Sequence, residues 1–170
     1  PDVSATSPTN NQKPTWTWEA KGGGNGTFRY QLNSDAGSWT TTTETSFTPG
    51  SNLDEGNNTL YVQERDVVGN WSTSGTKLVA IDITGPTAPS PSIAAGTYNA
   101  EQSVSLTPAG DAAATYYTTN GDTPDNESTS YSGAIAIDGN DGVTVTLKAV
   151  SYDALGNKGD VLSAAYVFDM

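Results

Sequence analysis

The chain contains no cysteine and no histidine, and only 7 of its 170 residues are lysine or arginine. These absences exclude a Ser-His or Cys-His pair, a zinc site of the usual kind and an imidazole acid or base. A chain without disulfides fits either a cytosolic protein or a bacterial surface protein that avoids thiols. The scarcity of basic residues favours the surface protein.

Basic residues are outnumbered by 19 aspartates and glutamates, which gives a net charge of −12. Such a charge repels nucleic acid and anionic membranes but tolerates calcium. It is uneven: residues 1–84 hold 5 basic and 9 acidic residues, and so carry −4, whereas residues 85–170 hold 2 and 10, and carry −8. We therefore expect no nucleic-acid or membrane partner, and the second half is the more calcium-prone.

Helical patterns are also missing, since no stretch carries an apolar stripe with helical spacing. No apolar run approaches the roughly 20 residues of a membrane-spanning helix. Glycine, threonine, serine and asparagine dominate, which predicts an all-β protein. The sequence starts without an initiator methionine or a signal peptide, so we expect a piece of a larger protein.

What the chain does have is an internal repeat. Asp66-Val67-Val68-Gly69-Asn70 returns 87 residues later as Asp153-Ala154-Leu155-Gly156-Asn157, and the same offset aligns residues 30–35 with residues 117–122. About ninety residues is the length of a small β-sandwich with its linker. In each copy the motif is expected in the turn between the last two strands, where glycine supplies a positive φ and the aspartate bonds backbone amides.

Residues 82–91 form a proline-rich connector, which predicts an extended, semi-rigid linker. We therefore expect two domains, residues 1–84 and 85–170, each with about seven short strands in two packed antiparallel sheets. The expected strands of the first are a short one near Val3, then 15–19, 27–32, 38–42, 45–48, 58–66 and 76–83. Those of the second are 92–94, 103–107, 115–119, 130–132, 134–137, 143–152 and 161–168.

The second half resembles the chitobiase/β-hexosaminidase C-terminal domain family over about eighty residues. The residues that carry the resemblance are Pro91, Gly96-Thr97-Tyr98, Val104-Ser105-Leu106, the run from Tyr116 to Pro124, Tyr131-Ser132-Gly133 and Ile135-Ala136-Ile137. The family usually has Asp-Gly where this chain has Asn120-Gly121, which weakens any acidic role at that position.

The first half is similar to bacterial Ig-like repeats of large secreted proteins, through Ser7-Pro8-Thr9-Asn10, residues 14–18, Phe28-Arg29-Tyr30, residues 46–49 and residues 60–72. Together the two resemblances imply tandem Ig-like or fibronectin-III-like β-sandwich modules joined end to end. They imply a non-catalytic accessory or stalk role in exported bacterial proteins. They do not imply hexosaminidase activity, because the catalytic residues of those enzymes lie in another domain.

All four tryptophans lie in the first half. Trp39 and Trp71 are candidates for stacking on sugar rings, while Trp16 and Trp18 share one face of an expected strand. The competing interpretation is structural, since an aromatic residue in a small sandwich more often belongs to the framework than to a binding surface. Similar Ig-like repeats also carry tryptophan at the positions of Trp39 and Trp71.

A calcium ion between the two domains is a further hypothesis. In an Ig-type sandwich the linker enters near the turns that precede the third and last strands, so Asp82 is expected to approach Asp111, Asp153 and Asn157. Asp54 and Glu55 could contribute from the first domain. Calcium takes six to eight such oxygens. The alternative is that these are solvated turn residues, and no cofactor is then required.

The expected function is a non-catalytic spacer or stalk of an exported bacterial surface or secreted protein, which orients other domains or an adhesive tip. Its partners would be neighbouring domains of the same chain, and the chain would be a monomer outside the cell. The alternative is a carbohydrate- or receptor-binding accessory module of a secreted glycan-active enzyme. Hydrolysis by Asp54 with Glu55, or by Asp125 with Glu127, is the most distant alternative, because these carboxylates lie on expected exposed turns.

Overall fold

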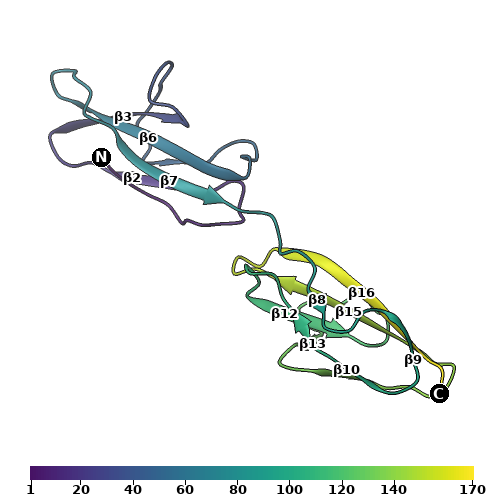
Figure 1. Cartoon of the computed structure of the whole chain (residues 1–170). Helices are drawn as coiled ribbons and strands as arrows, with labels where there is room; N and C mark the ends of the chain where they lie inside the picture. The colour runs from purple at the N-terminus through teal and green to yellow at the C-terminus, as the bar shows by residue number, and fades with distance from the viewer. The chain divides into compact units, whose positions relative to one another are not determined.

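The computed structural model describes all 170 residues and divides them into two compact units, Pro1–Ile83 and Thr84–Met170 (Figure 1). Both units consist of strands and connecting loops. No helix is long and apolar enough to cross a membrane. The predicted fold class, all-β with tandem sandwich modules, is confirmed.

The first unit is a sandwich of two sheets. Period-two alternation in the sequence places Trp16 and Trp18 on the inner face of one sheet, and Leu60 and Val62 on the inner face of the other. All four side chains are buried in one core, against which Leu53 packs from its loop. The three-stranded sheet has the order β1 (Asp2–Ser4), β2 (Trp16–Glu19), β5 (Ser46–Phe47), and the four-stranded sheet has the order β4 (Thr40–Thr42), β3 (Gly24–Leu32), β6 (Gly56–Asp66), β7 (Gly75–Ile81).

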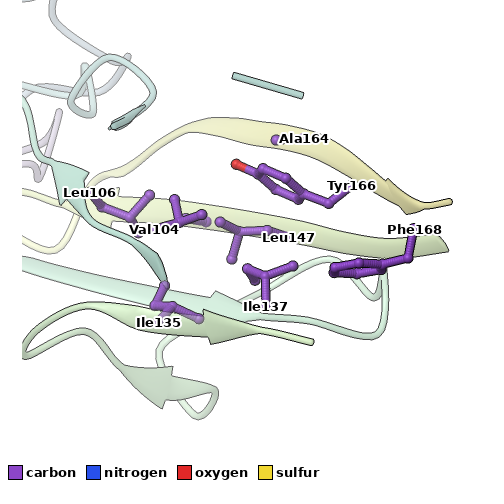
Figure 2. Packing of buried hydrophobic residues seen from close by; sticks show 9 residues of the cluster. Val104, Leu106, Ile135, Ile137, Leu147, Ala164, Tyr166 and Phe168 are labelled. Carbon is purple, nitrogen blue, oxygen red and sulfur yellow. The ribbon is translucent and has the colours of Figure 1, made fainter. Parts of the chain in front are cut away.

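The second unit has its own core, in which Leu147 and Tyr166 of the large sheet face Val104 and Ile137 (Figure 2). That sheet has the order β13 (Thr129–Ser130), β12 (Ala114–Thr118), β15 (Thr144–Tyr152), β16 (Lys158–Phe168), β9 (Gly96–Tyr98). Two short pairs complete the unit: β10 (Gln102–Val104) with β14 (Ile135–Ile137), and β11 (Leu106–Thr107) with β8 (Ser90–Pro91).

Strand register preserves the repeat offset of 87 residues. Phe28 lies opposite Glu64 in the pairing of β3 with β6, and the residues 87 positions later, Thr115 and Ser151, lie opposite each other in β12 and β15. Leu60 likewise lies opposite Lys77 in the pairing of β6 with β7, and the residues 87 positions later, Leu147 and Ala164, lie opposite each other in β15 and β16. The sequence repeat is therefore a repeat of sheet register.

Some expected strands of the second unit differ from the structure. Residues 92–94 form no strand, and the expected strand 103–107 is split into β10 and β11 at Ser105. Here the amide of Ser105 donates to Oγ of Ser92 at 2.9 Å instead of to a backbone carbonyl, which interrupts the ladder. β9 was not expected, because Gly96–Tyr98 carries no alternating pattern.

The proline-rich connector is largely part of the second unit. Pro86 is fully buried, and its carbonyl accepts a hydrogen bond of 3.1 Å from the amide of Asp160. A Cβ at Gly85 would lie 2.2 Å from the carbonyl oxygen of Lys158, so the two backbones approach as closely as glycine permits. The segment after residue 83 is therefore anchored along β16 rather than extended in solvent.

Candidate functional site

The first copy of the repeated motif forms the tip of the hairpin that joins β6 and β7. Oδ1 of Asp66 accepts the amides of Val68 at 3.0 Å and Asn70 at 2.8 Å, and Oδ2 accepts the side-chain amide of Asn70 at 3.1 Å. Gly69 has a φ of 101°. The backbone hydrogen bond from Asn70 is the main reason that the pKa of Asp66 lies below its ordinary value.

The second copy repeats this geometry between β15 and β16. Oδ1 of Asp153 accepts the amides of Leu155 and Asn157, both at 2.8 Å, and Oδ2 accepts the side-chain amide of Asn157 at 2.8 Å. Burial alone would raise the pKa of Asp153, but the hydrogen bonds from Asn157, Leu155 and Gly156 outweigh it and the pKa is lowered. Each aspartate thus holds a turn, as the motif predicted.

Of the residues predicted to bind calcium, Asp153 and Asn157 are brought together in this turn. Asp111 is exposed and lies in the turn before β12. The first residue of β12, Ala114, pairs with Tyr152, the residue that precedes Asp153. Asp82 belongs to the other unit. No group of three or more acidic side chains that could hold a metal ion is present, and the calcium site between the domains stays a prediction.

The tryptophans divide into two pairs. Trp16 and Trp18 are buried in the core of the first unit, which confirms their shared face. Trp39 and Trp71 are half-buried outside the core, and the guanidinium of Arg29 lies 4.7 Å from the ring centre of Trp39 and 4.5 Å from that of Trp71. One face of each ring is thereby occupied by an arginine of the same sheet.

The position of this stack is fixed by the neighbouring strand. Arg29 on β3 donates from Nε and Nη2 to Oε1 of Gln63 on β6, and Arg65 lies 5.7 Å from the ring centre of Trp71. Sequence analysis missed the stack, although the alternation that buries Phe28 and Tyr30 turns Arg29 to the outer face. An arginine on the outer face of a strand, with tryptophans in the neighbouring segments, is the signal that could have revealed it.

The carboxylates considered for hydrolysis are all exposed: Asp54, Glu55, Asp125 and Glu127. Oδ1 of Asp125 accepts the amide of Glu127 and the hydroxyl of Ser128, both at 3.0 Å, and the backbone bond from Glu127 is the first reason that its pKa is lowered. A glycosidase acid needs a raised pKa, which this environment opposes.

Three comparisons place the chain among known proteins. Residues 93–163 match the family model of the chitobiase/beta-hexosaminidase C-terminal domain. No curated protein matches the sequence.

Among solved structures, the chain is similar to fibronectin(III)-like modules of Clostridium thermocellum CbhA, with 10% identity, a TM-score of 0.41 and coverage of 98% of this chain and 94% of that one. It is also similar to a two-domain fibronectin type-III segment of chicken tenascin, with 18% identity, a TM-score of 0.39 and coverage of 96% of each chain. The FN1–FN3 domains of chicken CNTN1 match with 14% identity, a TM-score of 0.40 and coverage of 99% of this chain and 66% of that one.

The family match lies within the second unit and runs from β9 into the first half of β16, including the run from Tyr116 to Pro124 that carries the sequence resemblance. The matched family is the one that these residues resemble, so the recognition made from them is confirmed. The second unit of this chain is thus a module with a chitobiase/beta-hexosaminidase C-terminal domain match, in tandem with a second all-β unit.

Proposed function

We propose that the two units are non-catalytic spacer modules of a larger exported bacterial protein, which hold other domains or an adhesive tip at a set separation. The observation that carries this proposal is the pairing of the first and last segments within each unit. These segments run parallel, so the chain enters each unit at one end of the paired segments and leaves at the other.

In the second unit, Tyr166–Phe168 of β16 pairs in parallel with Gly96–Tyr98 of β9. The amide of Asp169 continues the ladder by donating to the carbonyl of Tyr98 at 2.9 Å. Figure 1 places the C-terminus of the chain beside β9. The end of the final strand is therefore held by a segment near the start of the same unit.

The first unit uses a smaller version of the same arrangement. Thr9 forms a parallel bridge with Ile81. Its amide donates to the carbonyl of Ala80 at 3.0 Å, and its carbonyl accepts the amide of Asp82 at 3.0 Å. A force that pulls the two ends of either unit apart loads these hydrogen bonds together, whereas antiparallel terminal strands would open one bond at a time. Such units suit a chain that transmits tension.

The proposed partners are neighbouring domains of the same chain, and the proposed location is the bacterial surface or the extracellular space. The absence of cysteine and the net charge of −12 support this location. The match to a domain found at the C-terminal end of chitobiase and beta-hexosaminidase supports a role beside, not within, a catalytic domain.

A glycan-binding accessory role is the second candidate, because the matched family takes its name from glycan-active enzymes. Trp39 and Trp71 would be the binding residues, and a sugar would need to use the ring faces that Arg29 leaves uncovered. Titration with chitin or cellulose oligomers tests this candidate. A saturable change in tryptophan fluorescence that Trp39→Ala removes would support it, and an unchanged spectrum would reject it.

Single-molecule stretching of the variant Thr9→Pro tests the spacer proposal. Proline removes the amide that donates to Ala80, while the control Thr9→Ala keeps that amide and removes only the side chain. We expect Thr9→Pro to lower the unfolding force of the first unit and Thr9→Ala to leave it close to that of the natural sequence. Equal forces in the two variants would contradict the proposed mechanical role of the terminal pairing.

A further inference from the structure

Glu64 is a buried carboxylate without a countercharge. It lies on the inner face of β6 with 7% of its surface exposed. Its Oε2 accepts one long hydrogen bond of 3.3 Å from the amide of Lys21, and its Oε1 accepts none. The ammonium of Lys21 is directed to Asp2 instead, at 2.5 Å. Buried charges in proteins are normally paired or bound to a metal ion, so Glu64 requires an explanation.

The fold itself does not require a carboxylate at this position. The equivalent residue of the second unit, 87 positions later, is Ser151, which is fully buried and forms a 2.8 Å hydroxyl pair with Thr115. The same register therefore holds a pair of hydrogen-bonded hydroxyls in one unit and, in the other, a carboxylate that accepts a single long backbone hydrogen bond. This difference between two copies of one framework points to a ligand of the first unit.

The loop before β3 is built around this carboxylate. A Cβ on Gly24 would lie 1.7 Å from Oε1 of Glu64, so only glycine leaves room for the side chain. Gly22 and Gly23 precede it with φ values of 92° and 81°, and both line the cavity that Glu64 also lines. Gly24 thus allows the main chain to approach the carboxylate closely.

Glu64 lines an open cavity of about 240 Å³ whose polar lining groups are oxygen-rich. Asp66 lies two residues along the same strand, hence on the same face, and contributes a second carboxylate. Asn70 donates its side-chain amide to Asp66, which leaves its Oδ1 without a hydrogen bond. The remaining lining residues are Gly22, Gly23, Gly24, Trp71 and Ser72.

We propose that this cavity binds a hard divalent cation of the calcium type. Glu64 supplies the buried charge, Asp66 and Asn70 supply further oxygens, and water completes the six to eight ligands that calcium takes. Oxygen atoms alone favour calcium over zinc, which selects nitrogen and sulfur. With two carboxylates the dissociation constant is expected at about 10⁻⁴–10⁻³ M, the range of extracellular calcium modules.

This site is distinct from the calcium site predicted at Asp153, and the tryptophans allow the two to be told apart. All four tryptophans lie in the first unit, and Trp71 lines the cavity. Terbium(III), a luminescent substitute for calcium, emits strongly only when a nearby tryptophan transfers energy to it. Terbium in the cavity is therefore detected by excitation of tryptophan, and the variant Asp153→Asn shows whether the second unit contributes to the signal.

The experiment is a terbium titration of the whole chain, followed by displacement with calcium. We expect saturable emission that millimolar calcium removes, at least a tenfold weaker affinity in Glu64→Gln, and an unchanged titration in the control Asp153→Asn. Glu64→Ser, which installs the residue of the second unit, provides a second variant in case Glu64→Gln misfolds. The proposal is overturned if the natural sequence gives no sensitised emission, or if correctly folded Glu64→Gln or Glu64→Ser binds terbium as tightly as the natural sequence does.

Discussion

Replacing Leu147 by alanine tests whether the two units are separate folding units. Leu147 is fully buried in the middle of β15, and Figure 2 shows its side chain between Val104 and Ile137. Removing a buried leucine side chain costs about 2–5 kcal/mol of unfolding free energy, because burial is lost and a cavity remains. For a domain of this size each kcal/mol lowers the melting temperature by about 4–8 °C, so we expect a decrease of roughly 8–40 °C.

Two optical signals separate the units. Tryptophan fluorescence reports only the first unit, because residues 85–170 contain no tryptophan, whereas far-UV circular dichroism reports both. We expect Leu147→Ala to shift one circular-dichroism transition downward and to leave the fluorescence midpoint unchanged. The reason is that the core around Leu147 contains no residue of the first unit.

The repeat supplies a matched control. Leu60 occupies the equivalent position 87 residues earlier and is also fully buried. Leu60→Ala is expected to lower the fluorescence midpoint and to spare the transition of the second unit. If Leu147→Ala lowered the fluorescence midpoint by as much as it lowers the circular-dichroism transition, the two cores would not be independent and the reasoning would fail.

Four further predictions follow from individual contacts. Arg29→Ala removes the contacts to both outer tryptophan rings and should lower the stability of the first unit by about 1–2 kcal/mol in a urea titration followed by fluorescence; no loss would show that the stack is unimportant. Asp153 has a lowered pKa, so the stability that it contributes is present above its ordinary pKa of 3.8 and is lost as the pH falls through the lower pKa of the folded state. Asp153→Asn should therefore reduce the decline of the melting temperature at acid pH. The hydroxyl of Tyr166 donates to the carbonyl of Ile93 at 2.8 Å, and burial raises the pKa of this hydroxyl. The stability that Tyr166 contributes is therefore present below its ordinary pKa of 10.0 and is lost as the pH rises toward the pKa of the folded state. Tyr166→Phe should lose this alkaline decline in melting temperature but be less stable at neutral pH. Gly24→Ala should destabilise the first unit in a thermal melt, because its Cβ overlaps the carboxylate of Glu64.

Period-two alternation was sufficient to predict most of the fold. It placed Trp16 and Trp18 on one face of their strand, and both are buried together with Leu60 and Val62. The repeat offset then implied a shared register, which the pairing of the strands confirms. Alternation failed at Ser92, whose side-chain oxygen accepts the amide of Ser105 in place of a backbone carbonyl. The pattern of hydrophobic residues does not change when a side chain replaces a carbonyl as the acceptor, so it could not predict the break in the strand.

The functional residues were harder to foresee. The role of Asp66 and Asp153 in their turns could be predicted from the spacing of the motif alone. Each aspartate accepts a hydrogen bond from a backbone amide two residues later, so no residue distant in the sequence is needed. The burial of Glu64 depends on Gly24, about forty residues away in the sequence, and the orientation of Arg29 depends on Gln63. Such contacts between distant positions cannot be read from local patterns.

The most direct test of the spacer account is the stretching curve of the natural chain. The account predicts two separate unfolding events, each of which releases about 25–30 nm, the extended length of a unit of about 85 residues. It also predicts that both events need appreciable force, because the terminal segments are paired in parallel. One event of double length, or a gradual extension without peaks, would contradict it.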